Sequence, residues 1–196
     1  INGASWSNEG KFGKALSFDG SDDYIDVGNP GSLQITSDLA ISAWIKPTAF
    51  NSNSGIVTKY YNTDGNRGYN FGIDSNGNLS FRASSDGTAT VNTNSDQAVS
   101  LNQWSHTVAV YDASSGTVSY YIDGALDSTK TGLPNSLYNS PKNFMIGSWD
   151  SGAVGDHLFD GLIDEVKVYP YALTEDEIKL DYNQGKSLVM SSSGTE

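Results

Sequence analysis

The sequence predicts an all-β domain of two stacked antiparallel sheets, with one short helix near the C-terminal end. Short segments of alternating apolar and polar residues recur roughly every 8–12 residues, and no fixed longer period repeats. An Asn-Gly pair at 76–77 and an Asp-Gly pair at 123–124 mark tight hairpins, because both tolerate positive φ. The 21 glycines and the 37% apolar content suit many short strands joined by polar turns.

The clearest strands lie in the segments 40–47 and 104–111. In the first, apolar residues alternate with Ser42, Trp44 and Lys46, which point the other way. In the second, His106 shares a face with two valines, so we expect a buried imidazole with a backbone partner. Both segments read as strands of a sandwich.

The single helix is predicted by its capping signals. Thr174 suits the N-cap, and Glu177, three residues later, completes a capping box. Ile178 and Tyr182 lie one turn apart, so this stripe is expected to pack on the edge of the sandwich. Gly185 is expected to end the helix.

Charge and composition exclude several classes of partner. The formal net charge of −12 argues against nucleic acid and against anionic membrane surfaces. It makes Ca²⁺ the natural inorganic partner, since hard cations prefer oxygen ligands. Cys is absent, and no apolar run suggests membrane insertion. We expect one domain over residues 1–188 and a linker or disordered tail over 189–196, as part of a larger multidomain chain.

Three segments in order resemble the laminin G-like jelly-roll family of bacterial-type extracellular proteins. They are residues 13–27, 40–47 with 56–59, and 159–169 followed by the capped helix. The resemblance spans roughly residues 10–185 and implies a two-sheet antiparallel jelly-roll sandwich of the concanavalin A-like kind. It also implies an extracellular or cell-surface location. It fixes function less well, because this sandwich hosts lectins, adhesins, carbohydrate-binding modules and enzymes.

An acidic strand-turn-strand and one later aspartate form the candidate metal site. Asp19, Asp22 and Asp23 cluster around Gly20, and Asp164 shares strand parity with valines expected in the core. The resemblance implies a structural calcium held by Asp164 with Asp19 or Asp22. The alternative is that Asp19 and Asp22 form Asx-type turns and that Asp164 accepts backbone N–H bonds.

The candidate ligand surface consists of two loops rich in aromatic and polar side chains. An aromatic face with polar groups around it suits sugar recognition. The loop residues singled out are Tyr60, Tyr61, Arg67, Trp149, Asp150 and His157. Each of them also has a purely structural reading. A second possibility is the face of one sheet, with Trp44, Lys59 and Arg82 pointing outwards.

The sequence favours binding over catalysis. Only five glutamates occur, the dense acidic run 175–177 belongs to the helix start, and no histidine has a nucleophile nearby. We therefore expect a non-catalytic, lectin-like carbohydrate-binding module for a glycan or polysaccharide. Two alternatives stay open: an adhesin or pilus-type domain that binds a cell-surface protein or acts as a spacer, and a polysaccharide hydrolase or lyase.

Overall fold

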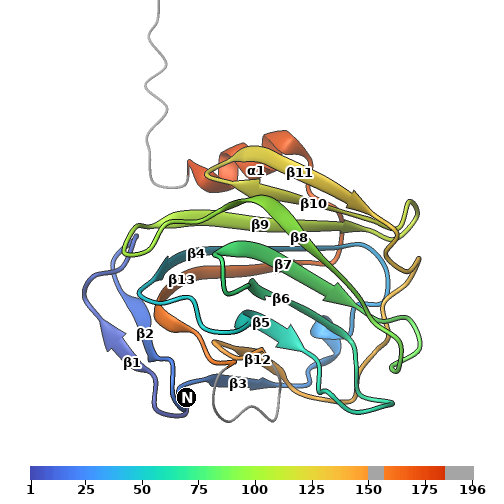
Figure 1. The fold of residues 1–196 in the computed structure, drawn as a ribbon, viewed down its shortest axis with the longest axis horizontal. Coiled ribbons are helices and arrows are strands. Elements are labelled where there is room, and N and C mark those ends of the chain that lie inside the picture. The colour runs from blue at the N-terminus through green and yellow to red at the C-terminus, as the bar shows by residue number, and fades with distance from the viewer. Residues whose placement is uncertain (150–156, 184–196) are drawn as a thin grey trace, which may run out of the picture.

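The structure is a computed structural model that describes residues 1–149 and 157–183. Two antiparallel sheets stack face to face, with the six-stranded sheet in front of the seven-stranded one in Figure 1. The predicted jelly-roll sandwich with one short C-terminal helix is confirmed. Within the described residues, no helix has the length and apolar character needed to cross a bilayer.

The seven-stranded sheet joins segments from both ends of the chain. Its strands, in spatial order, are β1 (Ser5–Ser7), β2 (Ala15–Asp19), β13 (Asp160–Tyr169), β4 (Leu39–Pro47), β9 (Ser105–Asp112), β10 (Thr117–Ile122) and β11 (Ala125–Thr131). The long strand β13 pairs with β2 on one side and β4 on the other. The late strand therefore ties the N-terminal segment to the centre of the sheet.

The six-stranded sheet contains the other strands. They are, in spatial order, β3 (Ile25–Gly28), β12 (Phe144–Ile146), β5 (Ser54–Lys59), β6 (Tyr69–Ile73), β7 (Asn78–Ala83) and β8 (Val91–Ala98). A short 3₁₀ helix, Gly31–Leu33, follows β3. The hairpin between β6 and β7 turns at Gly77, whose φ of 88° lies in the region that favours glycine.

The main core lies between the two sheets and follows the alternation of the strands. Ile41, Ala43 and Ile45 of β4 point into it, as do Tyr69 and Phe71 of β6. Each of these five side chains is completely buried. Their neighbours along each strand therefore point away from the core, and the outer faces of both sheets carry the remaining side chains.

Helix α1 (Glu175–Tyr182) packs on the outer face of the seven-stranded sheet, so its expected position at the sandwich edge is wrong. The predicted capping box between Thr174 and Glu177 is present. Ile178 is buried in a second, smaller cluster with Val108 and Val110 of β9. The helix ends at Tyr182, and Gly185 lies outside the described residues.

A β-bulge in β13 reverses the predicted orientation of Asp164. The register passes from Asp164 opposite Trp44 to Lys167 opposite Ser42, so two residues on β13 face one on β4. Glu165 adopts a φ of 50° at this point. The bulge places Asp164 on the outer face although Val166 packs against the core. The expectation that Asp164 shares a face with the core valines is therefore wrong.

Candidate functional site

A row of polar side chains crosses the outer face of the six-stranded sheet. The register aligns Thr58 of β5 with Asn70 of β6, Asn70 with Arg82 of β7, and Arg82 with Asn92 of β8. Thr58 and Asn70 are buried, Arg82 is half-buried, and Asn92 is exposed. The accessible part of this row is therefore the half formed by β7 and β8.

The inner half of the row is covered by the backbone of residues 147–149. Thr58 Oγ1 and Asn70 Nδ2 donate hydrogen bonds to the Trp149 carbonyl at 2.9 and 2.7 Å. A Cβ at Gly55 would overlap the carbonyl of Ser148, so glycine permits this close approach of the two backbones. Trp149 as a whole is only 4% exposed.

Arg82 is held against two aromatic rings at the boundary between the covered and accessible halves. Its guanidinium carbon lies 5.1 Å from the ring centre of Trp149 and 5.7 Å from that of Tyr60. Both distances suit cation–π attraction. The Nε atom of Arg82 and the Oδ1 atom of Asn70 are buried without a hydrogen-bond partner. Such atoms cost stability unless something else satisfies them.

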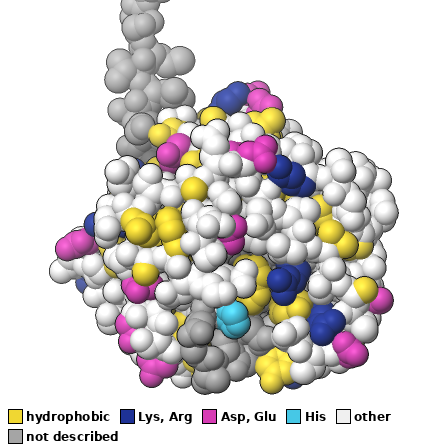
Figure 2. All heavy atoms as spheres, viewed as in Figure 1, with side chains coloured by type: hydrophobic (Ala, Val, Ile, Leu, Met, Phe, Trp, Pro, Cys, Tyr) yellow, Lys and Arg dark blue, Asp and Glu magenta, His cyan; other side chains and the backbone are white. Residues whose placement is uncertain are grey.

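A chain of hydrogen bonds orients the accessible carboxamides beside Arg82. Ser80 donates to Asn92 at 3.1 Å, Asn92 donates to Asn94 at 3.2 Å, and Asn94 donates to Asp74 at 2.9 Å. In Figure 2, Lys and Arg side chains and apolar surface lie close together near the centre of this face, while most acidic side chains lie toward its rim. The accessible half of the row therefore combines the guanidinium of Arg82 with oriented amide groups.

The structure brings together two of the ligand residues predicted from sequence. Tyr60 and Trp149 meet at Arg82, but Tyr60 is only 1% exposed and its hydroxyl donates to Asn62. Both rings therefore position Arg82 and present little surface for a sugar ring to stack on. Asp150 lies outside the described residues.

The other three predicted ligand residues have partners elsewhere. The Lys142 amine lies 4.8 Å from the ring centre of Tyr61. Arg67 forms an ion pair with Asp64 at 3.4 Å and donates to the Thr88 carbonyl. His157 Nδ1 lies 2.7 Å from the carbonyl oxygen of Ser52. None of these side-chain contacts involves the row that contains Arg82, although the backbone carbonyl of His157 accepts the N–H of Trp149 at 3.0 Å.

Lys59 and Trp44 do not join Arg82 on one outward face, so that expectation is wrong. The amine of Lys59 is buried and donates to Asn29 Oδ1 at 2.6 Å and to two backbone carbonyls. Burial lowers the pKa of Lys59. Trp44 lies on the outer face of the other sheet, stacked on Tyr182 at 5.6 Å with the Lys11 amine 4.0 Å from its ring centre.

His106 has side-chain partners in place of the predicted backbone partner. Its Nε2 atom lies 3.0 Å from Ser42 Oγ and 3.1 Å from Asp181 Oδ2, and Lys167 donates to the other Asp181 oxygen at 2.6 Å. Burial alone would raise the pKa of Asp181, but hydrogen bonds from His106, Lys167 and Ser42 hold it well below its usual range. This network fastens α1 to the sheet.

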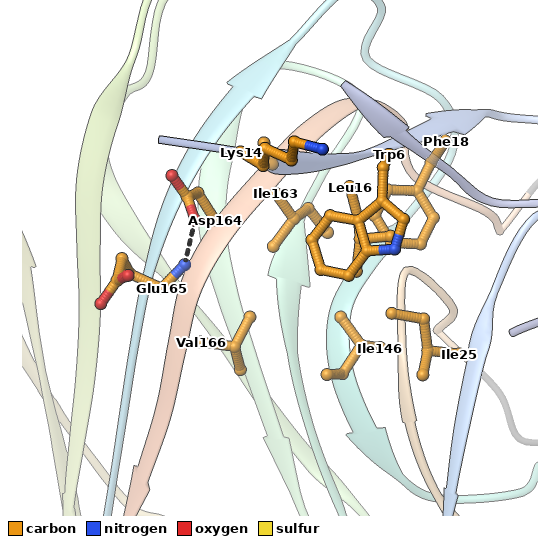
Figure 3. A pocket seen from close by; sticks show the side chains of 11 residues that line it. Trp6, Lys14, Leu16, Phe18, Ile25, Ile146, Ile163, Asp164, Glu165 and Val166 are labelled. Atoms are coloured by element: carbon orange, nitrogen blue, oxygen red, sulfur yellow. Dashed lines mark hydrogen bonds between the residues drawn. The ribbon is translucent and has the colours of Figure 1, made fainter. Parts of the chain in front are cut away.

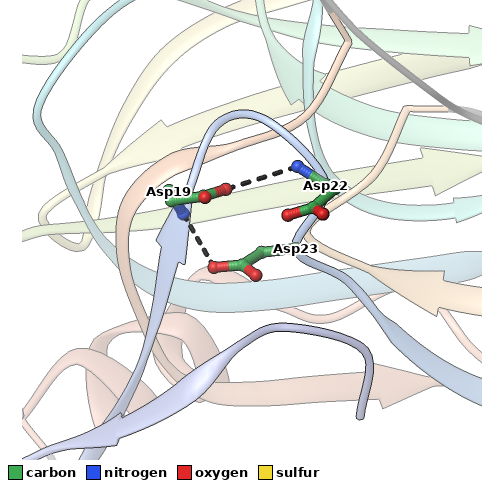
Figure 4. A group of neighbouring side chains, drawn as sticks. All are labelled: Asp19, Asp22 and Asp23. Atoms are coloured by element: carbon green, nitrogen blue, oxygen red, sulfur yellow. Dashed lines mark hydrogen bonds between the residues drawn. The ribbon is translucent and has the colours of Figure 1, made fainter.

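Three carboxylates form the candidate metal centre at the turn between β2 and β3 (Figure 4). Ligand atoms of Asp19, Asp22 and Asp23 lie within 4.8 Å of one another. Asp19 Oδ1 accepts the backbone N–H groups of Ser21 and Asp22, and Asp23 Oδ2 accepts that of Asp19. Burial, with the charges of Asp19 and Asp22, raises the pKa of Asp23 despite that hydrogen bond. An all-oxygen donor set fits Ca²⁺.

Asp164 lies away from this cluster. Its carboxylate accepts the backbone N–H groups of Phe12 at 3.0 Å and Glu165 at 2.9 Å, as the alternative interpretation expected. In the pairing of β2 with β13, the residue opposite Asp19 is Asp160, four positions before Asp164. The structure therefore does not bring together the ligand set that the resemblance implied.

A separate apolar pocket lies between β1, β2 and β13 of one sheet and β3 and β12 of the other (Figure 3). Its volume is about 160 Å³, and Trp6, itself 63% exposed, forms part of its wall. The other apolar lining residues come from strands of both sheets: Ala15, Leu16, Phe18, Ile25, Ile146, Ile163 and Val166. Lys14, Asp164 and Glu165 also line the pocket, but apolar side chains form most of its wall.

Sequence reasoning named Arg82 only as a second possibility and missed its neighbours Asn70, Asn92 and Asn94. A signal was present, because polar residues alternate with core residues along β6 and β7. Segment 91–98 carries asparagines with the same period of two. What the pattern could not give is the register that aligns them.

Comparison with known proteins places the fold. The family model of the concanavalin A-like lectin/glucanases superfamily matches residues 19–179. Domain 4 of AbnA, an extracellular arabinanase from Geobacillus stearothermophilus in complex with arabinotriose, superposes with a TM-score of 0.69 at 22% identity, covering 91% of this chain and 80% of that one. The CBM40 of Ruminococcus gnavus IT-sialidase, bound to α2,3 sialyllactose, superposes with a TM-score of 0.70 at 16% identity. The match covers 86% of this chain and 96% of that one.

A third structure is part of a larger molecule. The binding domain of Paraclostridial Mosquitocidal Protein 1 superposes with a TM-score of 0.70 at 21% identity, covering 93% of this chain. This chain spans only 46% of that structure's length. Comparison with curated sequences finds no match. The family match covers most of the chain, which therefore belongs to the concanavalin A-like lectin/glucanase superfamily as a laminin G-like domain.

Proposed function

We propose that this domain is a non-catalytic carbohydrate-binding module whose glycan site is the accessible half of the polar row. The observation that carries the proposal is the juxtaposition of Arg82, held by two rings, with the oriented carboxamides of Asn92 and Asn94. Guanidinium and carboxamide groups supply the donors and acceptors that sugar hydroxyls require. Thr58, Asn70, Arg82 and Asn92 include no carboxylate pair for general acid and base chemistry.

Similar structures support a glycan as the partner. Arabinotriose is bound in the arabinanase domain and sialyllactose in the sialidase module. The arabinanase is described as extracellular, which supports an extracellular or cell-surface role for this domain as part of a larger chain. A shallow polar site suits dissociation constants of roughly micromolar to millimolar size, because few ring faces are available for stacking.

Affinity electrophoresis against neutral and acidic polysaccharides tests the proposal and its location. The native domain should be retarded by at least one glycan, and Arg82→Ala and Asn92→Ala should each abolish the retardation. Lys179→Ala, on the helix of the opposite sheet, is the matched control and should behave as the native chain. If Arg67→Ala abolished binding while Arg82→Ala did not, the site would lie in the 60–67 loop. Absence of retardation by every glycan would refute carbohydrate binding and favour the protein-interaction or spacer role.

We also propose that Ca²⁺ binds Asp19, Asp22 and Asp23 and stabilises the turn between β2 and β3. Support comes from the mutual proximity of the three carboxylates and from the raised pKa of Asp23, because a bound cation would offset both burial and repulsion. The role would be structural, since the site contains no group shared with the row around Arg82.

A further inference from the structure

The charge balance of this chain makes Arg82 unusual. The sequence has 23 acidic and 11 basic side chains, so carboxylates are abundant. The other arginine, Arg67, pairs with Asp64 at 3.4 Å. Across residues 1–149 and 157–183, no ion pair includes Arg82. A guanidinium that is not fully hydrated usually has a carboxylate or phosphate as its partner.

The described surroundings of Arg82 fix its position, and none of the carboxylates among them pairs with it. Two aromatic rings lie 5.1 and 5.7 Å from the guanidinium carbon, and Nε has no acceptor. The rings limit the rotamers of the side chain, so little entropy is lost when an anion binds. A planar guanidinium can then donate two parallel hydrogen bonds to one carboxylate.

The groups beside Arg82 are suited to hydroxyls. Asn92 and Asn94 are oriented by the hydrogen bonds that run from Ser80 to Asp74, and each keeps further donor or acceptor capacity. A ligand that fits both features carries a carboxylate next to several hydroxyl groups. We infer that the site selects acidic sugars, either uronic or sialic acids, through an ion pair between the sugar carboxylate and Arg82.

The inference rests on the proposed glycan-binding function and deepens it. It also decides a question that the similar structures leave open, because sialyllactose carries a carboxylate and arabinotriose does not. An acidic peptide offers the same carboxylate but lacks the ring hydroxyls that suit the asparagines. We therefore choose the sugar and treat peptide binding as an outcome of the test.

The experiment compares each acidic glycan with its own methyl ester, which removes the charge and keeps the hydroxyls. Sialyllactose, polygalacturonate and hyaluronan, each with its ester, are titrated into the native domain by calorimetry. At least one free acid should bind tenfold or more tightly than its ester. Arg82→Gln should remove that difference, Arg82→Lys should restore part of it, and Lys179→Gln should keep it.

The outcomes separate the inference from the proposed function. Equal binding of acid and ester, or binding of neutral glycans alone, would overturn acid selection and leave carbohydrate binding intact. Binding of poly-glutamate as tight as that of the acidic glycans would overturn the sugar as the partner. Absence of binding to any glycan would overturn both proposals. Circular dichroism and melting temperature verify the folding of each variant, and the acid and ester comparison on the native chain stands without any variant.

Discussion

The outer faces of the two sheets contain similar side chains and use them differently. Each face has a tryptophan with a cation against its ring, Trp149 with Arg82 on one sheet and Trp44 with Lys11 on the other. On the seven-stranded sheet, α1 covers the tryptophan, and Asp181 accepts hydrogen bonds from the buried polar groups around it. On the six-stranded sheet, no carboxylate of the described residues pairs with Arg82.

The contrast shows which polar clusters in this fold are structural. His106, Ser42 and Lys167 converge on one carboxylate, and among them only His106 Nδ1 is without a partner. A group already bound to its partner has little left to offer a ligand. The half-buried guanidinium of Arg82 pairs with no carboxylate of the described residues, so we place the ligand beside it on the six-stranded sheet.

The largest expected effect comes from a substitution on the outer face of the seven-stranded sheet, which α1 covers. Asp181→Ala would leave buried His106 and Ser42 without the carboxylate that they contact, so we expect a loss of about 3 kcal/mol in the free energy of unfolding. Lys167 would keep its ion pair with Glu165 at 3.5 Å. Urea unfolding measures it. Glycan affinity at a temperature where the variant is folded should be unchanged. A loss of affinity there would show that the two faces are not independent.

The carboxylate of Asp181 should also make the folding stability depend on pH. The pKa of Asp181 is depressed in the folded state. The ionised carboxylate therefore stabilises the fold above the usual Asp pKa, and this stabilisation is lost as the pH falls through the folded-state pKa. The stability difference between the native chain and Asp181→Asn should therefore shrink below about pH 4. Urea unfolding of both proteins from neutral to acidic pH measures it. A difference that stays constant in acid would contradict the assigned ion pairing.

The next effect tests the covered half of the row. In Gly55→Ala the new methyl group would overlap the Ser148 carbonyl, so the backbone at 148–149 must move. Overpacking of this kind costs about 2 kcal/mol. Because that backbone holds Trp149 against Arg82, glycan affinity should fall as well. Gly31→Ala, where a Cβ has open space, is the control and should change neither the stability nor the glycan affinity.

Calcium removal should give a smaller effect at the turn between β2 and β3. With a dissociation constant of about 0.1 mM, 1 mM Ca²⁺ would stabilise the fold by about 1.4 kcal/mol. A chelator should lower the melting temperature accordingly, and Asp22→Asn should remove the shift. Asp164→Asn should keep it, because the cluster does not include Asp164. If only Asp164→Asn removed the shift, the calcium site would lie elsewhere.

The smallest expected effect on stability sharpens the contrast between the faces. Arg82→Gln removes two cation–π contacts and should cost about 1 kcal/mol or less, since the guanidinium is half-buried. The same variant should abolish glycan binding in affinity electrophoresis. A large stability loss with retained binding would make Arg82 a structural residue like those beneath α1.

The parts of the fold that depend on local sequence were predictable. The capping box of α1 needs only Thr174 and Glu177, and the hairpin turns need only their Asn-Gly and Asp-Gly pairs. The bulge was not predictable, because Glu165 is a non-glycine residue with positive φ and nothing nearby signals it. The bulge turned Asp164 away from the core and out of the expected ligand set.

The candidate site depends on contacts between distant residues. Arg82 is far in sequence from Trp149, and the partner of His106 lies 75 residues away in the helix. Periodicity shows which residues share a face of one strand, but the register between strands decides which of them meet. For that reason the sequence predicts Tyr60 and Trp149 as sugar contacts, whereas in the structure both rings lie against the guanidinium of Arg82.

The attachment of α1 has a consequence for where this domain can be cut. A fragment that stopped after β13 would contain every strand of both sheets described here, yet it would expose Trp44 and leave His106 without Asp181. The family match itself ends at residue 179, two positions before Asp181. Expression of the minimal unit should therefore extend through at least Tyr182, because the last turn of the helix supplies the carboxylate that contacts a buried histidine of β9.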